Sequence, residues 1–218
     1  MAEVRIESLN LGAVEAVRFA DGGEIQSAIR KRPQAEPVAL TLAGLPGDQV
    51  HHHAHGGPNR ALHVYPIEHY QVFEEIASHP LPIPCFGENI TLRGMTETQV
   101  RVGDVWQIGA SRLQVTMPTE RCAHPGRLAG APLILKRIVR DALCGWYLRV
   151  LEPGEIQVGD EVSRVEVGRD DVSLVDLHIW MRDHAGDPDI LERVQAMHAL
   201  APEWKERMGV LHARRRRA

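Results

Sequence analysis

One cysteine stands among positively charged residues in a stretch suited to chemistry. Cys122 lies in MPTERCAHPG, residues 117–126, directly after Arg121 and five residues before Arg127. Positive charge near a thiol favours the thiolate, the form that attacks electrophiles and binds metals. A free cysteine is more often a small buried apolar residue, and this interpretation stays open for Cys122. The preceding LQVTM alternates as a strand does, so Cys122 is expected in a loop at a strand end, where functional residues are common.

Three chemistries are open for this thiol. In a cysteine hydrolase His124 would be the base, but side chains two residues apart seldom meet in the required hydrogen bond. A redox sensor needs a resolving cysteine, and no sequence neighbour of Cys122 supplies one. In a cofactor enzyme the thiolate binds a soft transition metal while other residues hold the cofactor. The third chemistry uses the most sequence features. Cys85 and Cys144 lie in apolar segments and are expected to be buried.

A diglycine turn is the second feature with chemical potential. Gly56 and Gly57 precede Pro58-Asn59-Arg60 at the start of the run ALHVY. Adjacent glycines let backbone N–H groups converge on an anion, and an arginine adds a charged fork that suits phosphate. A tight turn into a strand would explain the same residues. Both interpretations stay open.

Two further patterns are weaker. His51, His53 and His55 alternate along the chain, and on one face of a strand they could ligate zinc or iron. Exposed loop histidines are the favoured alternative, because a metal site also needs supporting partners. In FGENITLRG, residues 86–94, Asn89 could direct its amide into a cleft or simply help to start a strand.

The elements that must position these residues are mostly strands. Short runs rich in valine, leucine and isoleucine, separated by glycine, proline or aspartate, predict a mainly β fold, an antiparallel barrel or sandwich with a few inserted helices over 67–79 and 132–143. After residue 167 the period becomes helical, and Asp187-Pro188 and Ala201-Pro202 indicate helix starts. We therefore expect a barrel domain over 1–166 and a small three-helix domain with a basic tail over 167–218.

Composition narrows the class of protein. The 218 residues are 44% hydrophobic and 25% charged, with a net charge of −4, which is ordinary for a globular chain. Three cysteines without a CxxC pair suit a reducing compartment. The start lacks a leader pattern and no apolar run would span a membrane, so a cytoplasmic protein is expected. The arginine run 214–217 is interpreted as a solvated tail, and nucleic-acid binding is not expected.

Four ordered motifs carry a resemblance to a known family. With HGGPNRALHVYP, CFGENIT, VRVGDVWQIG and PTERCAHPG in this order, the chain resembles the MOSC family, the molybdenum cofactor sulfurase C-terminal domain. It looks most like bacterial stand-alone members with a barrel and three C-terminal helices. The resemblance implies a molybdenum–pterin cofactor and reduction of N-hydroxylated compounds such as 6-N-hydroxylaminopurine. It implies Cys122 as the catalytic residue and molybdenum ligand. The candidate cofactor-binding residues are His55, Gly56, Gly57, Asn59, Arg60, Asn89, Thr119, Arg121 and Arg127.

The segment around Cys122 differs in detail from this family's pattern. Relatives often read Pro-Arg-x-Pro-Cys before the metal ligand and carry a lysine two residues after it. Here Arg121 directly precedes the sulfur, and His124 stands in the place of the lysine.

The predicted activity needs electrons from elsewhere. No dinucleotide-binding glycine pattern and no cluster-forming cysteine set is visible, so the expected partner is a separate reductase, a flavoprotein or an iron–sulfur protein. The other expected partners are a small N-hydroxylated substrate and, as an option, a second copy of the chain. Two alternatives remain: a protein that carries molybdenum cofactor or sulfur without catalysis, and a hydrolase that binds zinc or iron through histidines.

Overall fold

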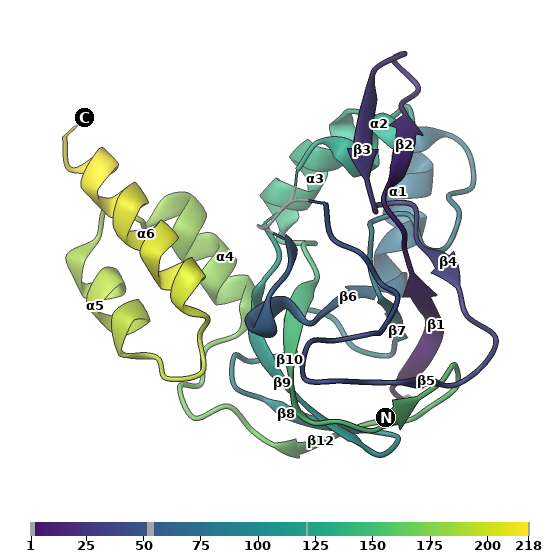
Figure 1. Ribbon diagram of the computed structural model, residues 1–218. Coiled ribbons are helices and arrows are strands. Elements are labelled where there is room, and N and C mark those ends of the chain that lie inside the picture. Colours follow the sequence, from purple (N-terminus) through teal and green to yellow (C-terminus); the bar gives the residue numbers. More distant parts are fainter. Residues whose placement is uncertain (1–2, 52–54, 121, 218) are drawn as a thin grey trace.

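The computed structural model describes residues 3–51, 55–120 and 122–217. Its centre is a curled eight-stranded sheet with the order β12-β8-β9-β10-β6-β7-β1-β4 (Figure 1). The strands are β1 (Arg5–Leu11), β4 (Arg32–Pro33), β6 (Leu62–Pro66), β7 (Ile90–Arg93), β8 (Val105–Ile108), β9 (Ser111–Pro118), β10 (Trp146–Glu152) and β12 (Val162–Glu166). Two small sheets pair β2 (Glu15–Arg18) with β3 (Glu24–Ser27) and β5 (Val38–Ala39) with β11 (Glu155–Ile156).

The sheet curls far enough for β1 to meet the segment that leads into β12. The amide of Ile6 donates to Asp160 O at 3.0 Å, and the amide of Val162 donates to Val4 O at 2.8 Å. β12 is the first strand in the sheet order and β1 is the next to last, after β7, so these bonds join strands from opposite ends of the sheet. The result is a strongly curved sheet that surrounds much of the core.

The fold is mixed rather than mainly β. Helix and strand contribute about 29% and 28% of the chain, which corrects the expectation of a mainly β protein. One pairing in the large sheet, between β6 and β7, is parallel, so the sheet is not purely antiparallel. Parallel neighbours need a crossover, and α1 (Tyr70–Ala77) supplies it between these strands.

The remaining helices lie where the period of the sequence changes. Within the sheet region are the short 3-10 helices η2 (Pro58–Arg60) and η3 (Ile67–His69), with α2 (His124–Leu128) and α3 (Leu133–Asp141). The three predicted C-terminal helices are α4 (Leu174–Asp183), α5 (Pro188–Ala196) and α6 (Pro202–Arg215). A capping box formed by Ser173 and Asp176 begins α4, and prolines occupy the first turns of α5 and α6.

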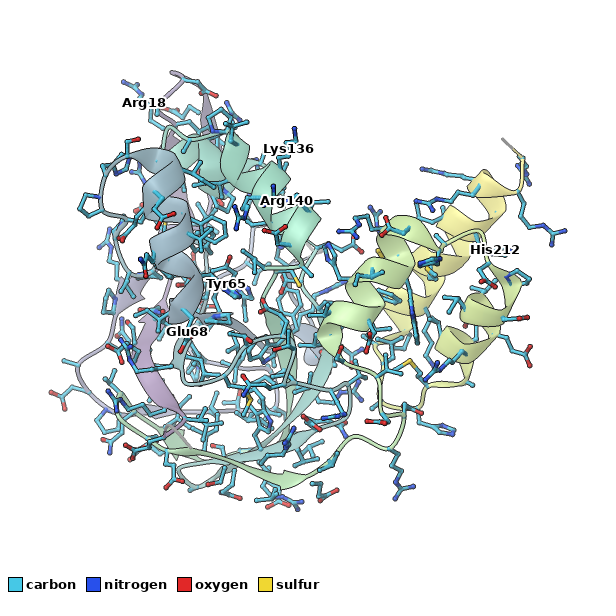
Figure 2. The ribbon with its side chains drawn as sticks, turned by 180° about the vertical axis from the view of Figure 1, so that it is seen from behind. Arg18, Tyr65, Glu68, Lys136, Arg140 and His212 are labelled. Atoms are coloured by element: carbon cyan, nitrogen blue, oxygen red, sulfur yellow. The ribbon has the colours of Figure 1, made fainter. Side chains whose placement is uncertain are left out.

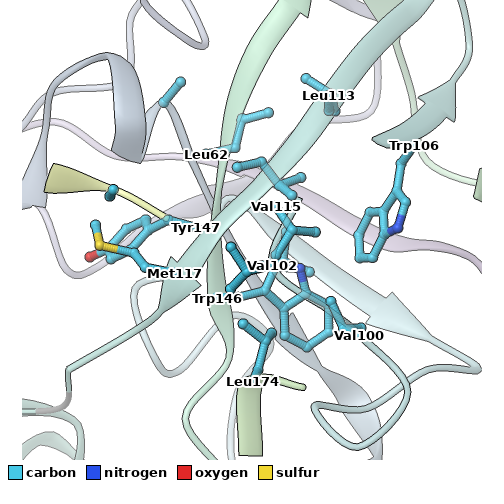
Figure 3. Packing of buried hydrophobic residues seen from close by; sticks show 14 of the residues in the cluster. Leu62, Val100, Val102, Trp106, Leu113, Val115, Met117, Trp146, Tyr147 and Leu174 are labelled. Atoms are coloured by element: carbon cyan, nitrogen blue, oxygen red, sulfur yellow. The ribbon is translucent and has the colours of Figure 1, made fainter. Parts of the chain in front are cut away.

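One hydrophobic cluster joins the sheet to the C-terminal helices. Trp106 and Trp146 meet edge to face inside the sheet, with ring centroids 5.7 Å apart, and Leu174 of α4 belongs to the same cluster (Figure 3). Trp204 and Met208 extend it along α6. The helices are therefore packed onto the sheet, while the division of the chain into domains at 166 and 167 stays a prediction.

The helical unit also holds the end of α3. His178 Nε2 lies 2.9 Å from Val139 O, and Arg182 donates to Val139 O and Arg140 O at 3.0 and 2.6 Å. These groups satisfy carbonyls at a helix C-terminus, where cations are favoured. Arg140 marks this end of α3 in Figure 2. In the part of the chain that the structure describes, no helix has both the length and the apolar character to span a membrane.

Candidate active site

A pocket of about 750 Å³ gathers most of the residues that the sequence singled out. Its walls come from the loop before η2, the segments around β3 and β7, β10, and the loop between β9 and α2. The predicted site residues that line it are His55, Gly56, Gly57, Arg60, Asn89, Thr119 and Cys122. The volume lies in the range of small-molecule and cofactor sites.

Cys122 is the accessible thiol of the described chain. It is half-buried in the loop that follows Pro118, the last residue of β9. Cys85 and Cys144 are buried, 7% and 0% exposed, as their apolar contexts predicted. The strand thus ends where the sequence pattern placed it, and the thiol opens into the pocket.

Thr119 brings an unsatisfied hydroxyl to the same wall. Its backbone amide donates to Gly145 O at 3.0 Å, which fixes the residue against the start of β10. The residue is 5% exposed, and among the described residues its Oγ1 has no hydrogen-bond partner. A buried hydroxyl without a partner costs about 1–3 kcal/mol. In a pocket wall, such a hydroxyl is a candidate hydrogen-bond partner for a bound group.

The diglycine turn has a conformation that requires glycine at one position. Gly57 has φ 103° and ψ 169°, a region that residues with a Cβ avoid, and it precedes η2. The turn brings Arg60 to the pocket with its side chain 17% exposed. The guanidinium carbon lies 6.0 Å from the centre of the Tyr147 ring, within cation–π range. His55 Nδ1 lies 3.5 Å from the Tyr147 hydroxyl oxygen.

Asn59 faces away from the pocket. Its side-chain amide donates to the carboxylate of Glu203 on α6 at 3.2 and 3.4 Å, and Asn59 is not among the residues that line the cavity. Neighbouring residues of one short helix turn project in different directions, so Arg60 and Asn59 serve different contacts.

Asn89 lines the pocket, but its amide group holds protein segments together. Its Oδ1 accepts from the His63 amide at 3.0 Å, and its Nδ2 donates to Asn10 O at 3.2 Å and to Asp48 Oδ2 at 2.8 Å. Both amide hydrogens are therefore used. The neighbouring Glu88 is fully buried and accepts from Tyr70 and from the Phe86 amide, so its carboxylate stabilises the loop.

Arg127 also lies outside the pocket wall. Its guanidinium donates two hydrogen bonds to Asp21, at 2.7 and 3.0 Å, and stacks 3.9 Å above the Phe19 ring. These bonds hold the pKa of the Asp21 carboxyl below its usual value. The His124 ring also stacks on the Phe19 ring, with ring centroids 5.3 Å apart. Burial, together with the charge of Arg127, lowers the pKa of the His124 imidazole. Arg121 lies outside the described residues.

The histidine run lies only partly within the described residues. His51 is exposed, His55 contacts Tyr147, and His53 lies outside the described residues. Within residues 3–51, 55–120 and 122–217, no three histidine, cysteine or acidic side chains are grouped as metal ligands.

Several residues that line the pocket were not identified from the sequence. Lys31 and Asp48 form an ion pair at 2.5 Å, with side chains only 7% and 11% exposed. Burial lowers the pKa of the Lys31 ammonium, and the carboxylate of Asp48 opposes this effect. Tyr147 and His63, which lie in apolar strands, complete the wall. No local pattern separates these residues from core residues, although the turn LPGD around Asp48 is a recognisable loop signal.

Comparison with known proteins identifies the family. The MOSC domain model matches residues 51–163. YflK of Bacillus subtilis is 33% identical over 91% of this chain and 90% of its own length, and YiiM of Escherichia coli is 32% identical over 84% and 83%. A protein of Gibberella moniliformis named "Reductase" is 33% identical over 76% of this chain but only 29% of its own length.

A solved structure agrees with the sequence matches. The crystal structure of YiiM from Geobacillus stearothermophilus superposes with a TM-score of 0.81 and 27% identity, and it covers 96% of this chain and 99% of its own. The shared fold extends over both the sheet and the C-terminal helices. The chain therefore belongs to the MOSC domain family and is of the YiiM-like type.

Proposed function

We propose that this protein reduces N-hydroxylated compounds with a molybdenum–pterin cofactor bound in the 750 Å³ pocket. The observation that carries the proposal is the half-buried Cys122 thiol, which lines the same large pocket as the Arg60 guanidinium and the unsatisfied Thr119 hydroxyl. Family membership and the match to a fungal protein named reductase support an oxidoreductase.

The residues present fit such a cofactor. A thiolate is a soft donor and suits molybdenum, so Cys122 would be its protein ligand. Arg60 offers a planar fork that stays protonated and would pair with the pterin phosphate. Thr119 Oγ1 would regain a hydrogen bond, and Gly57 leaves its side of the pocket open because no atom lies within 4 Å of its absent Cβ.

The reaction consumes two electrons and two protons: R–NHOH + 2e⁻ + 2H⁺ → R–NH₂ + H₂O. When bound, the cofactor supplies the two electrons to the N–O bond. The protein excludes water from one side of the pocket with the buried side chains of Phe86 and Tyr147. Lys31 lies at the wall with its ammonium paired to Asp48, so this pair adds no net charge to the pocket and Arg60 remains the cation assigned to the phosphate. The electrons come from a separate reductase.

The decisive experiment compares molybdenum content in wild type and Cys122→Ser, both produced in a host that makes the cofactor. We expect near-stoichiometric metal in wild type and at least a tenfold loss in the variant. Cys85→Ala is the matched control, because it removes a buried thiol away from the pocket wall. Equal occupancy in wild type and Cys122→Ser would remove the assignment of the ligand.

Turnover separates an enzyme from a carrier. Molybdenum-loaded protein is incubated with 6-N-hydroxylaminopurine and a chemical reductant, and adenine is measured. Adenine formation that Cys122→Ser abolishes supports the reductase. Bound cofactor without turnover of several N-hydroxylated compounds would indicate that the protein carries the cofactor.

A further inference from the structure

One turn of α6 contacts two separate segments of the pocket wall through charged side chains. Glu203 Oε1 lies 4.0 Å from Arg60 Nη1, and Arg207 Nε lies 2.5 Å from Glu120 Oε2. Arg60 and Glu120 both line the pocket, one in the turn after the diglycine and the other two residues before Cys122. Glu203 and Arg207 are four residues apart and so lie on one face of the helix.

The four charges alternate in sign. Arg60 and Arg207 both attract the Glu120 carboxylate, and Glu203 attracts Arg60. In one pair the helix supplies the anion and in the other it supplies the cation. Together the two pairs fix the turn of Arg60 and the segment of Glu120 relative to each other, whereas a single pair would hold only one of them. The side chains are partly exposed, from 17% for Arg60 to 56% for Arg207, so each pair alone is weak.

Backbone contacts strengthen the same connection. The amide of Ala201, at the start of α6, donates to Thr116 O of β9 at 3.1 Å. The side-chain hydroxyl Thr116 Oγ1 donates to Asn59 O at 2.7 Å, and the side-chain amide of Asn59 donates to the Glu203 carboxylate. α6, β9 and the turn that presents Arg60 therefore form one hydrogen-bonded unit. β9 leads directly into the loop of Cys122.

We infer that α6 belongs to the functional site, and that Glu203 and Arg207 are positioning residues. They fix the turn that carries Arg60 relative to the loop that carries Cys122. The arrangement itself follows from contacts in the free protein. Its consequence for cofactor retention rests on the proposed function. The C-terminal helices would thus control how tightly the pocket holds its ligand.

The reactivity of Cys122 in the free protein tests this inference. Iodoacetamide is uncharged, and the alkylation rate at Cys122 is measured by mass spectrometry in wild type, Glu203→Gln and Arg207→Gln. If α6 holds the loop, both variants loosen it and both rates rise, by about threefold for contacts of this exposure. Removing an anion and removing a cation change the potential at the thiol in opposite directions, so a purely electrostatic effect would shift the two rates oppositely.

Matched controls lie on the same helix. Glu206→Gln and Arg214→Gln make the same changes at exposed residues that have no ion-pair partner among the described residues, and wild-type rates are expected. The buried Cys85 and Cys144 report unfolding, since their alkylation would reveal a variant that fails to fold. In that case Arg207→Lys decides, because it keeps a positive charge that faces Glu120 and should keep the rate near that of wild type.

Unchanged rates, opposite shifts, or an Arg207→Lys variant as reactive as Arg207→Gln would overturn the inference. A second measurement follows molybdenum loss from loaded protein during dialysis, where Glu203→Gln and Arg207→Gln should lose metal about threefold faster than wild type. If wild type binds no molybdenum, the proposed function fails, while the alkylation result still decides the role of α6.

Discussion

Lys31 and Asp48 form an ion pair in the pocket wall, with Nζ 2.5 Å from Oδ1. The carboxylate also accepts from the Gly12 amide at 2.7 Å and from Asn89 Nδ2 at 2.8 Å. One acidic group thus joins the loop after β1, the loop before η2 and the start of β7. The Lys31 ammonium neutralises the Asp48 carboxylate, which is largely buried and has little access to water.

Replacing Lys31 by methionine should therefore be costly. The variant leaves the Asp48 carboxylate buried without its cation, and loss of one partner of a buried pair typically costs about 3–5 kcal/mol. The double variant Lys31→Met with Asp48→Asn removes both charges and should regain at least about 1 kcal/mol of the free energy of unfolding. Urea unfolding measures both. A double variant less stable than Lys31→Met would contradict the importance of the pair.

Thr119 offers a test in which stability and binding move in opposite directions. Thr119→Val removes a buried hydroxyl that has no partner among the described residues, so the free protein should be as stable as wild type or gain about 1 kcal/mol. Retention of the cofactor should fall, because its hydrogen bond is lost. Molybdenum loss during dialysis and urea unfolding give the two results.

Thr116→Val, three residues earlier on β9, is the matched control. Thr116 Oγ1 lies 2.7 Å from Asn59 O and 3.0 Å from Tyr147 O, and its single hydrogen is donated to one of these carbonyls or shared between them, so its loss removes a buried hydrogen bond. This variant should be less stable by about 1–2 kcal/mol. If Thr119→Val destabilises the free protein as much, the idea of an unsatisfied hydroxyl reserved for a ligand is wrong.

The thiols should differ sharply in reactivity. Burial, with the nearby Glu88 carboxylate, raises the pKa of the Cys85 thiol to about 12, so at pH 8 about one molecule in ten thousand carries the thiolate. Cys144 is fully buried, whereas Cys122 is half-buried at the pocket. Brief alkylation of native protein at pH 8, followed by peptide mass spectrometry, should label Cys122 alone. Comparable labelling of Cys85 would show that the native protein opens around it.

The sequence predicted the elements whose signals are local. Alternating apolar residues located β9, the proline after them located its end, and Asp187-Pro188 located the start of α5. The positive φ of Gly57 explains the glycine before Pro58 in the same way. Each of these features depends on a few adjacent residues, so no knowledge of the tertiary fold was needed.

Contacts between distant segments could not be derived in this way. Arg127 was expected at the cofactor because it follows Cys122 closely, yet Asp21, more than a hundred residues earlier, binds its guanidinium. Asn59 was expected in the pocket, but Glu203 of α6 takes its amide. In both cases the packing of the sheet and helices brings a distant acidic residue within hydrogen-bond distance of the side chain. The spacing of residues along the chain does not reveal such a partner.

The two arginines make a final comparison possible. Arg60 lines the pocket, whereas Arg127 is held by Asp21 and Phe19 outside its wall. Arg60→Met should lower the molybdenum content of protein from a cofactor-competent host at least fivefold, because a charge that pairs with the phosphate is lost. Arg127→Met should stay within twofold of wild type. A larger loss in Arg127→Met than in Arg60→Met would mean that Arg127 leaves Asp21 and turns to the cofactor on binding, and that the phosphate lies nearer α2 than the diglycine turn.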